Sequence, residues 1–248
     1  MKHNLLLLAL SLTGFISTQT QASQLAITTN LSNARITGSV DDYLTGEHDS
    51  YTDGSVYSSS VIPLQVSQVF YDKDAFIPTA TASSQAELSV DIVQTGDGYS
   101  ILGAVSSTAN TEINSLDDND AIANGEAVVD LAFTLASDHN FTFTSSMFNA
   151  SGTGKSEVEL INKSTGTIFS QIVSENALDL NFSGNLLAGD YTLFIGALSE
   201  ASDADFASAS VGYDLQITAV PVPTALPLFL SGLITLGFKS RSKHKALT

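Results

Sequence analysis

An acidic run at residues 117–120 is the densest group of possible metal ligands in the chain. Carboxylate oxygens in a loop suit Ca²⁺, and the three carboxylates here are Asp117, Asp118 and Asp120. The run does not match an EF-hand loop, in which ligands alternate with other residues around a central glycine. A weaker candidate is the Asp-Ala-Asp segment 203–205. We therefore favour a solvated acidic turn over a calcium site, and we expect no other cofactor.

Groups that could catalyse a reaction are sparse. The chain has no cysteine, which excludes a thiol nucleophile and cysteine-rich zinc sites. We expect His48 and His139 to be solvated loop residues, because nothing near them in sequence supplies a nucleophile or an orienting group. The Ser-Gly-Thr-Gly-Lys-Ser segment 151–156 imitates a phosphate loop, but Asn149 replaces the first glycine and no helical pattern follows. We expect a turn there, and we assign no catalytic residue.

Charge is distributed unevenly along the chain, whose formal net charge is −17. All 26 Asp and Glu residues fall within residues 41–214. Only four of the 9 Lys and Arg residues lie in the same stretch or just before it, and the others lie close to the two ends. Binding to nucleic acid needs Lys and Arg to replace counterions, so this balance argues against a nucleic-acid partner.

Residues 1–22 have the pattern of a signal peptide. A basic start precedes an apolar run at 5–16, which is shorter than the roughly 20 residues of a transmembrane helix. Small residues at the end of the segment suit cleavage between Ala22 and Ser23. We therefore expect residues 23–219 to fold outside the cytoplasm, where a chain without cysteine needs no oxidation.

Residues 220–248 divide into three parts. The first is an extended, proline-spaced motif, since each proline disfavours helix in the residue before it. An apolar segment at 226–238 is expected to form a helix too short for a hydrocarbon core of roughly 30 Å. The basic end should stay in the cytoplasm. The residues concerned are Val220, Pro221, Val222 and Pro223 in the motif, Ser231, Gly232 and Leu233 in the helix, and Lys239, Arg241, Lys243 and Lys245 at the end.

These three parts, in this order, resemble a PEP-CTERM sorting signal, the tail that exosortase reads in Gram-negative bacteria. The resemblance is confined to the segment from Val220 onward, and the namesake Pro-Glu-Pro is here Pro221-Val222-Pro223. It implies processing by exosortase, a transient or retained inner-membrane anchor, and delivery to the cell surface or extracellular matrix. Members of the family are mostly associated with exopolysaccharide and biofilm production. A plain single-pass anchor is the alternative.

The body of the chain alternates between apolar and polar residues, as half-buried strands do. Clear examples are 88–92, 129–135 and 178–182, and a hairpin is predicted across 158–172. We count about eight strands between residues 86 and 219, and no convincing helix. The fold class is therefore all-β.

The N-terminal third of the body is less regular. We expect strands at 55–64 and 66–71, and loops at 41–42 and 49–54. The predicted architecture is one β-sandwich of jelly-roll type in which this third adds edge strands. Folding of residues 24–85 as a separate domain remains the alternative.

The function these patterns favour is that of a non-enzymatic, exported surface or matrix protein. Its expected partners are signal peptidase and exosortase as processing enzymes, exopolysaccharide in the matrix, and the membrane transiently. A glycan-binding module is the alternative, and a secreted hydrolase ranks third. Because the chain lacks tryptophan, the candidate aromatic contacts to a sugar are Tyr51, Tyr57, Tyr71 and Tyr99.

Overall fold

The computed structural model describes residues 25–43, 45–57, 64–77, 80–96, 98–113, 119–150, 153–173 and 176–220. In these ranges the chain forms thirteen strands, and the described residues contain no helix. The prediction of an all-β fold is therefore confirmed. The predicted signal peptide, its cleavage site at Ala22 and Ser23, and the tail from Pro221 onward lie outside the described residues.

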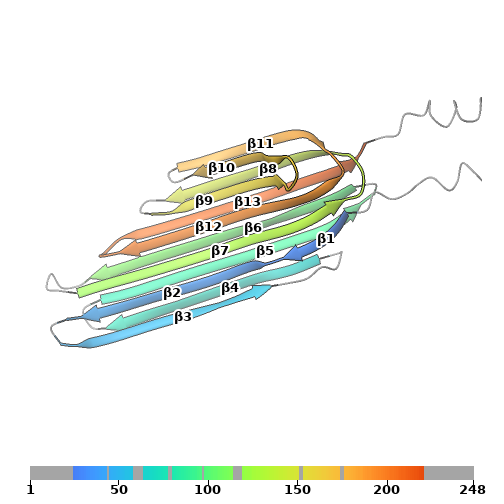
Figure 1. The fold of residues 1–248 in the computed structure, drawn as a ribbon. Coiled ribbons are helices and arrows are strands. Elements are labelled where there is room, and N and C mark those ends of the chain that lie inside the picture. The colour runs from blue at the N-terminus through green and yellow to red at the C-terminus, as the bar shows by residue number, and fades with distance from the viewer. Residues whose placement is uncertain are drawn as a thin grey trace, which may run out of the picture.

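Two antiparallel sheets stack along a common long axis (Figure 1). Sheet A has seven strands, in the order β10-β9-β12-β7-β2-β3, with β1 also paired to β7. Its strands are β1 (Leu25–Asn30), β2 (Ser32–Asp42), β3 (Glu47–Tyr57), β7 (Asn119–Leu135), β9 (Lys155–Asn162), β10 (Gly166–Val173) and β12 (Gly189–Ser202). Sheet B has six strands, in the order β11-β8-β13-β6-β5-β4. They are β4 (Leu64–Ile77), β5 (Ala80–Thr95), β6 (Gly98–Ile113), β8 (His139–Ala150), β11 (Asn176–Leu186) and β13 (Phe206–Ala219).

Strand β7 is the strand to which most of sheet A is attached. β12 pairs with one of its sides over the full length from Ile122 to Leu135. On its other side β2 and then β1 follow one another, with a short break at Leu31, whose N–H still donates to the Asp130 carbonyl at 2.9 Å. The first two strands therefore act as one long ribbon laid against β7.

The core between the sheets is built from the alternate residues of each strand. In β8, for example, Phe141, Phe143, Ser145 and Met147 are buried, while Thr142, Thr144 and Ser146, which alternate with them, are exposed. Phe169 of β10 meets Phe143 of β8 and Phe182 of β11, each with ring centroids 4.7 Å apart. This arrangement joins the two sheets through stacked and tilted aromatic rings, which add to the free energy of apolar burial.

The size of the buried side chains changes along the strands. One large cluster contains the buried Phe and Tyr residues of the described ranges, including Phe133 and Tyr191, whose rings stack with centroids 5.4 Å apart. A second, smaller cluster lies where β2 and β4 end and where β5 and β7 begin, and alanine dominates it. Its members are Val40, Ala75, Ile77, Ala80, Ala82, Ala109, Ala121, Ala123 and Ala201.

The two ends of the described chain lie at the same end of the sandwich (Figure 1). Leu25 is paired with Leu135 at the end of β7, and Ala219 is paired with His139 at the start of β8. The opposite end carries the β2–β3 turn and the turn between β12 and β13. We call this opposite end, which carries Asp41, Asp120 and Asp203, the acidic end.

The structure confirms several sequence predictions and corrects others. The hairpin at 158–172 is formed by β9 and β10. The predicted loops at 41–42 and 49–54 are wrong, because both segments are strand: Asp41 and Asp42 end β2, and 49–54 lies inside β3. The predicted strand at 55–64 is described only in part: residues 55–57 end β3 and Leu64 begins β4, whereas 58–63 lie outside the described residues. The N-terminal strands do extend the sheets, but β2 and β5 are internal and only β3 and β4 stand at the ends of the strand orders.

Two glycines on neighbouring strands provide a matched test of the packing. A Cβ at Gly103 would meet the Ser89 carbonyl and would lie 2.7 Å from the Tyr213 hydroxyl, whereas a Cβ at Gly212 would have nothing within 4 Å. We predict that Gly103→Ala lowers the free energy of unfolding by about 1–3 kcal/mol through overpacking. Gly212→Ala should leave it unchanged or raise it by about 0.5–1 kcal/mol, because glycine is unfavourable inside a strand. Urea denaturation of both variants would measure this, and equal effects would contradict the described packing.

Candidate functional site

Carboxylates from several strands gather at the acidic end. Asp41 of β2 and Asp120 of β7 are directly opposite each other in the ladder, and Asp203 follows β12 on the other side of β7. The Asp203 N–H donates to the Ala121 carbonyl at 3.2 Å, which fixes its backbone beside β7. Like charges placed directly opposite in a sheet repel each other. This end is therefore a region of concentrated negative charge.

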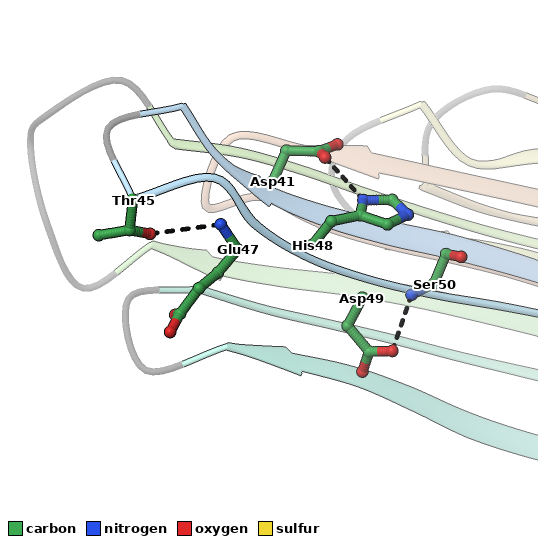
Figure 2. Close-up of polar contacts among 6 residues, drawn as sticks. All are labelled: Asp41, Thr45, Glu47, His48, Asp49 and Ser50. Atoms are coloured by element: carbon green, nitrogen blue, oxygen red, sulfur yellow. Dashed lines mark hydrogen bonds and ion pairs between the residues drawn. The ribbon is translucent and has the colours of Figure 1, made fainter.

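The β2–β3 turn brings one histidine to this group. His48 Nδ1 lies 2.6 Å from Asp41 Oδ1, and both side chains are exposed (Figure 2). Nearby, the Glu47 N–H donates to Thr45 Oγ1, and the Ser50 N–H donates to Asp49 Oδ1 (Figure 2). The other oxygen of Asp49 accepts the Phe76 N–H of β4 at 3.0 Å, so this carboxylate links the two sheets at their edge.

The pKa of the Asp120 carboxyl is shifted by burial and by the neighbouring carboxylates. Burial first, then repulsion by Asp203 and a hydrogen bond with it, and then repulsion by Asp41 raise the Asp120 pKa above its ordinary value of 3.8. A hydrogen bond from the Ala121 backbone acts in the opposite direction. The three carboxylates are therefore coupled across three neighbouring strands.

The predicted calcium loop is only partly covered by the structure. Asp117 and Asp118 lie outside the described residues. Asp120 is not a loop residue as predicted, because β7 already begins at Asn119. Among the described residues, no group of three or more His, Asp or Glu side chains is placed to hold a metal ion. The solvated acidic turn, favoured over a calcium site, therefore stays a prediction.

The two histidines differ from each other, and one prediction about them is wrong. His48 is exposed but belongs to strand β3. His139 is fully buried at the start of β8, with Nδ1 2.6 Å from the Ser137 carbonyl. Because a carbonyl can only accept, Nδ1 carries the proton in this contact. Within the described residues the buried Nε2 of His139 has no hydrogen-bond partner. A ring so enclosed cannot reach a substrate as it stands.

Of the four tyrosines proposed for stacking on a sugar, the two whose side chains the structure describes are not exposed platforms. Tyr99 is buried, and Tyr51 is half-buried with its hydroxyl 2.5 Å from Ser84 Oγ. The side chains of Tyr57 and Tyr71 are outside what the structure describes. Large exposed aromatic residues occur elsewhere, and include Tyr43, Phe76, Phe148 and Phe206.

The outer face of sheet B contains a shallow depression of about 460 Å³. We call it the Gly212 groove, because glycine at this position leaves its floor open. It is lined by Thr144, Ser145, Ser146, Asp179, Leu180, Asn181, Gly212, Tyr213 and Asp214, from strands β8, β11 and β13. A glycine inside a strand often marks a place where a ligand approaches the backbone.

Hydrogen bonds hold the two carboxylates of the Gly212 groove in place. Ser146 Oγ donates to Asp179 Oδ1 at 2.7 Å, and Gln216 Nε2 donates to Asp214 Oδ1 at 2.7 Å. Gln216 is in turn fixed by Ser100 Oγ at 2.9 Å. Each ionised carboxylate has about four acceptor positions. The remaining ones can accept hydrogen bonds from hydroxyl or ammonium groups of a ligand.

A second depression, of about 570 Å³, lies on the outer face of sheet A around Gly54. It brings together Arg35, Asp53 and Glu126, with Arg35 directly opposite Glu126 in the ladder. Sequence inspection singled out neither depression. One sequence feature points to the Gly212 groove: polar residues or glycine alternate with apolar residues in the segments 178–182 and 211–217. The pairing that brings these positions together follows only from the strand order.

Comparison with known proteins identifies no relative. No protein-family model matches the chain, and a search of the curated proteins returns no match. Of the predicted sorting residues only Val220 is described, as an exposed residue after β13, and the others lie outside the described residues. In the part of the chain that the structure describes, no helix is long and apolar enough to cross a membrane.

The raised pKa of Asp120 gives a pH-dependent prediction. A carboxyl whose folded-state pKa is raised costs stability once it ionises, so this cost is absent below pH 3.8 and grows as the pH rises through the folded-state pKa. Asp120→Asn should therefore raise the melting temperature at pH 7, and the gain should shrink as the pH falls toward 3.8. Asp91→Asn, on the outer face of sheet B, controls for the loss of one negative charge. Equal gains for both variants at pH 7 would contradict the coupling at the acidic end.

Proposed function

We propose that this chain is an exported surface or extracellular-matrix protein that binds polysaccharide through the outer face of sheet B. The observation that carries the proposal is the Gly212 groove, in which hydroxyl, amide and carboxylate groups surround an open floor. Such groups are the natural partners of sugar hydroxyls, since each can exchange a hydrogen bond with water for one with the ligand.

The charge of the groove restricts the class of polysaccharide. The outward-facing described residues of β8, β11 and β13 include Asp179 and Asp214 but no Lys or Arg. A polymer of uronic acids would bring further carboxylates to this surface and would be repelled. We therefore propose a neutral or amine-bearing polysaccharide. Phe148, which is 48% exposed and lies two residues beyond Ser146 on the same face, can contact the apolar face of a sugar ring.

The order of the strands supports the finer proposal of a jelly-roll fold. The eight strands from β6 to β13 form two four-stranded sets, β6-β13-β8-β11 and β7-β12-β9-β10. The chain passes from one sheet to the other at each connection in this series except the one from β9 to β10. Two antiparallel sheets wound in this way are the arrangement of a jelly roll, and β1 to β5 then extend it at one side.

The position of the chain ends fits an anchored or sorted protein. Leu25 and Val220 lie at one end of the sandwich, so a signal peptide at 1–22 and a PEP-CTERM-like tail at 220–248 would both extend from there. The acidic end would then face away from the membrane. This is consistent with processing by signal peptidase and exosortase in a Gram-negative bacterium, and with a short transmembrane helix at 226–238.

A non-enzymatic role is the simplest one for these residues. His139 is enclosed, and the contact of His48 with Asp41 on the surface involves no hydroxyl group. A secreted hydrolase remains the lower-ranked alternative, because paired carboxylates such as Asp179 and Asp214 are also the groups that glycosidases use. Release of reducing sugar from a bound polysaccharide would favour that alternative.

The binding proposal predicts a loss of affinity when the floor of the groove is filled. Gly212→Val should weaken binding to a neutral glucan, or to partly deacetylated poly-N-acetylglucosamine, at least tenfold, which is about 1.4 kcal/mol. Thr192→Val on the outer face of sheet A is the matched control and should bind normally. Isothermal titration calorimetry would measure both variants, with thermal melting to show that they are folded. Unchanged binding by Gly212→Val, or a preference for alginate, would contradict the proposal.

The sorting proposal predicts a change of location. Replacing Pro221 and Pro223 with Ala should leave the protein in the membrane fraction, because the tail would no longer be recognised and cut. Mass spectrometry of the protein released by wild-type cells should find a C-terminus upstream of the apolar segment. A released form that still carries Phe238 would contradict the proposal, whatever the outcome for polysaccharide binding.

A further inference from the structure

Strand β10 is an unusual edge for a protein with this much negative charge. Four strands stand at the ends of the two strand orders, namely β3 and β10 in sheet A and β4 and β11 in sheet B. Charged side chains occur in β3, β4 and β11, but the sequence of β10, Gly-Thr-Ile-Phe-Ser-Gln-Ile-Val, contains none. Edge strands are commonly protected from pairing by charge or by proline. Strand β10 has neither protection.

The side chains of β10 alternate between the core and solvent. Phe169 and Val173 are buried, whereas Ile168 and Ile172 are 37% and 49% exposed. The pairing of β10 with β9 is regular from Phe169 to Val173. The register shifts once, between Thr167 and Phe169, so Ile168 has no direct partner on β9. Apolar residues of high β-propensity on an unpaired edge favour addition of a further strand, because the main chain and the exposed side chains gain partners together.

We propose that β10 pairs antiparallel with β10 of a second copy of this chain, with Ser170 on the two-fold axis. In that register Ile168 of each copy lies opposite Ile172 of the other on the outer face. The strand is therefore complementary to itself, as a two-fold symmetric contact requires. The two copies of sheet A would become one continuous sheet, and the pair would display two polysaccharide-binding faces if the function proposed above is correct.

The distribution of charge favours this edge over the others for contact between two acidic copies. Glu157 and Glu159 are the carboxylates of the adjoining strand β9, and they lie opposite Ile172 and Ser170. Glu157 is already paired with Lys155 at 2.7 Å. The Glu159 side chains of the two copies would stand about three strand spacings apart, about 14 Å. This exceeds the Debye length of about 8 Å at physiological ionic strength, so their repulsion is largely screened.

Sedimentation velocity of the full chain, purified under native conditions, tests the proposal over a series of concentrations. The wild type should shift from monomer to dimer as concentration rises. Ile172→Lys should raise the dissociation constant of the dimer at least tenfold, because it places a charge opposite Ile168 of the other copy. Val56→Lys, at an exposed position of edge strand β3, is the matched control and should not change the constant. A monomer at all concentrations, or equal effects of the two variants, would overturn the proposal.

Cross-linking tests the register independently of affinity. The chain has no cysteine, so Ser170→Cys introduces a single thiol at the proposed axis. A short bis-maleimide should link two copies of this variant efficiently, whereas Thr52→Cys on β3 should give little linked dimer. Both variants need only be folded, which their melting curves would show. Equal yields from the two positions would overturn the register and the choice of β10, while leaving polysaccharide binding at the Gly212 groove unaffected.

Discussion

The register of strand β7 is the constraint on which most of the molecule depends. Its buried residues Val129, Leu131 and Phe133 belong to the main core, and its other end carries Asp120. Because side chains alternate with a period of two, a slip of one residue would expose the whole apolar set. Burial of the core residues therefore fixes the register, and the same register places Asp120 opposite Asp41. The electrostatic crowding at the acidic end is a consequence of packing far from it.

The same alternation separates stability from recognition within each strand. In β13, Val211, Tyr213 and Leu215 are buried in the core, while Gly212 and Asp214 face outward. Burial of Tyr213 raises the pKa of its phenol, and its hydroxyl donates to the Ser89 carbonyl at 3.3 Å. The inner positions are therefore committed to packing. The outer positions between them are free to form a binding surface without loss of core stability.

The strands with clear alternation could be predicted from the sequence, and those without it could not. Apolar residues alternate with polar ones in the segments 129–135 and 178–182 and in the hairpin at 158–172. They pack on or in the core from one face of each strand, so the pattern predicts the strands. Strand β3 was missed in part because it stands at the end of sheet A, where Tyr51 is its main contact with the core. An edge strand that buries so little keeps polar residues on both faces, so its sequence reads as a loop.

The candidate site was harder to predict than the fold because it is made by pairing between distant segments. Asp179 and Asp214 occupy ordinary outward positions in their strands, and only the strand order β11-β8-β13 brings them to one groove. In the same way, the burial of His139 depends on its place at the start of β8 and not on its neighbours in sequence. Residue types alone carry no information about such neighbours.

The alanine-rich cluster has a consequence for how the sandwich opens. Alanine buries less apolar area than leucine or phenylalanine, so each strand gains less free energy from packing around Ala121 and Ala123 than around Phe133. Proteins open in local units whose free energies follow such differences in packing. The strands should therefore separate from one another more often at the acidic end than around the aromatic residues of the main core. Amide hydrogens there would exchange through partial opening, while those around Phe133 would await unfolding of the whole molecule.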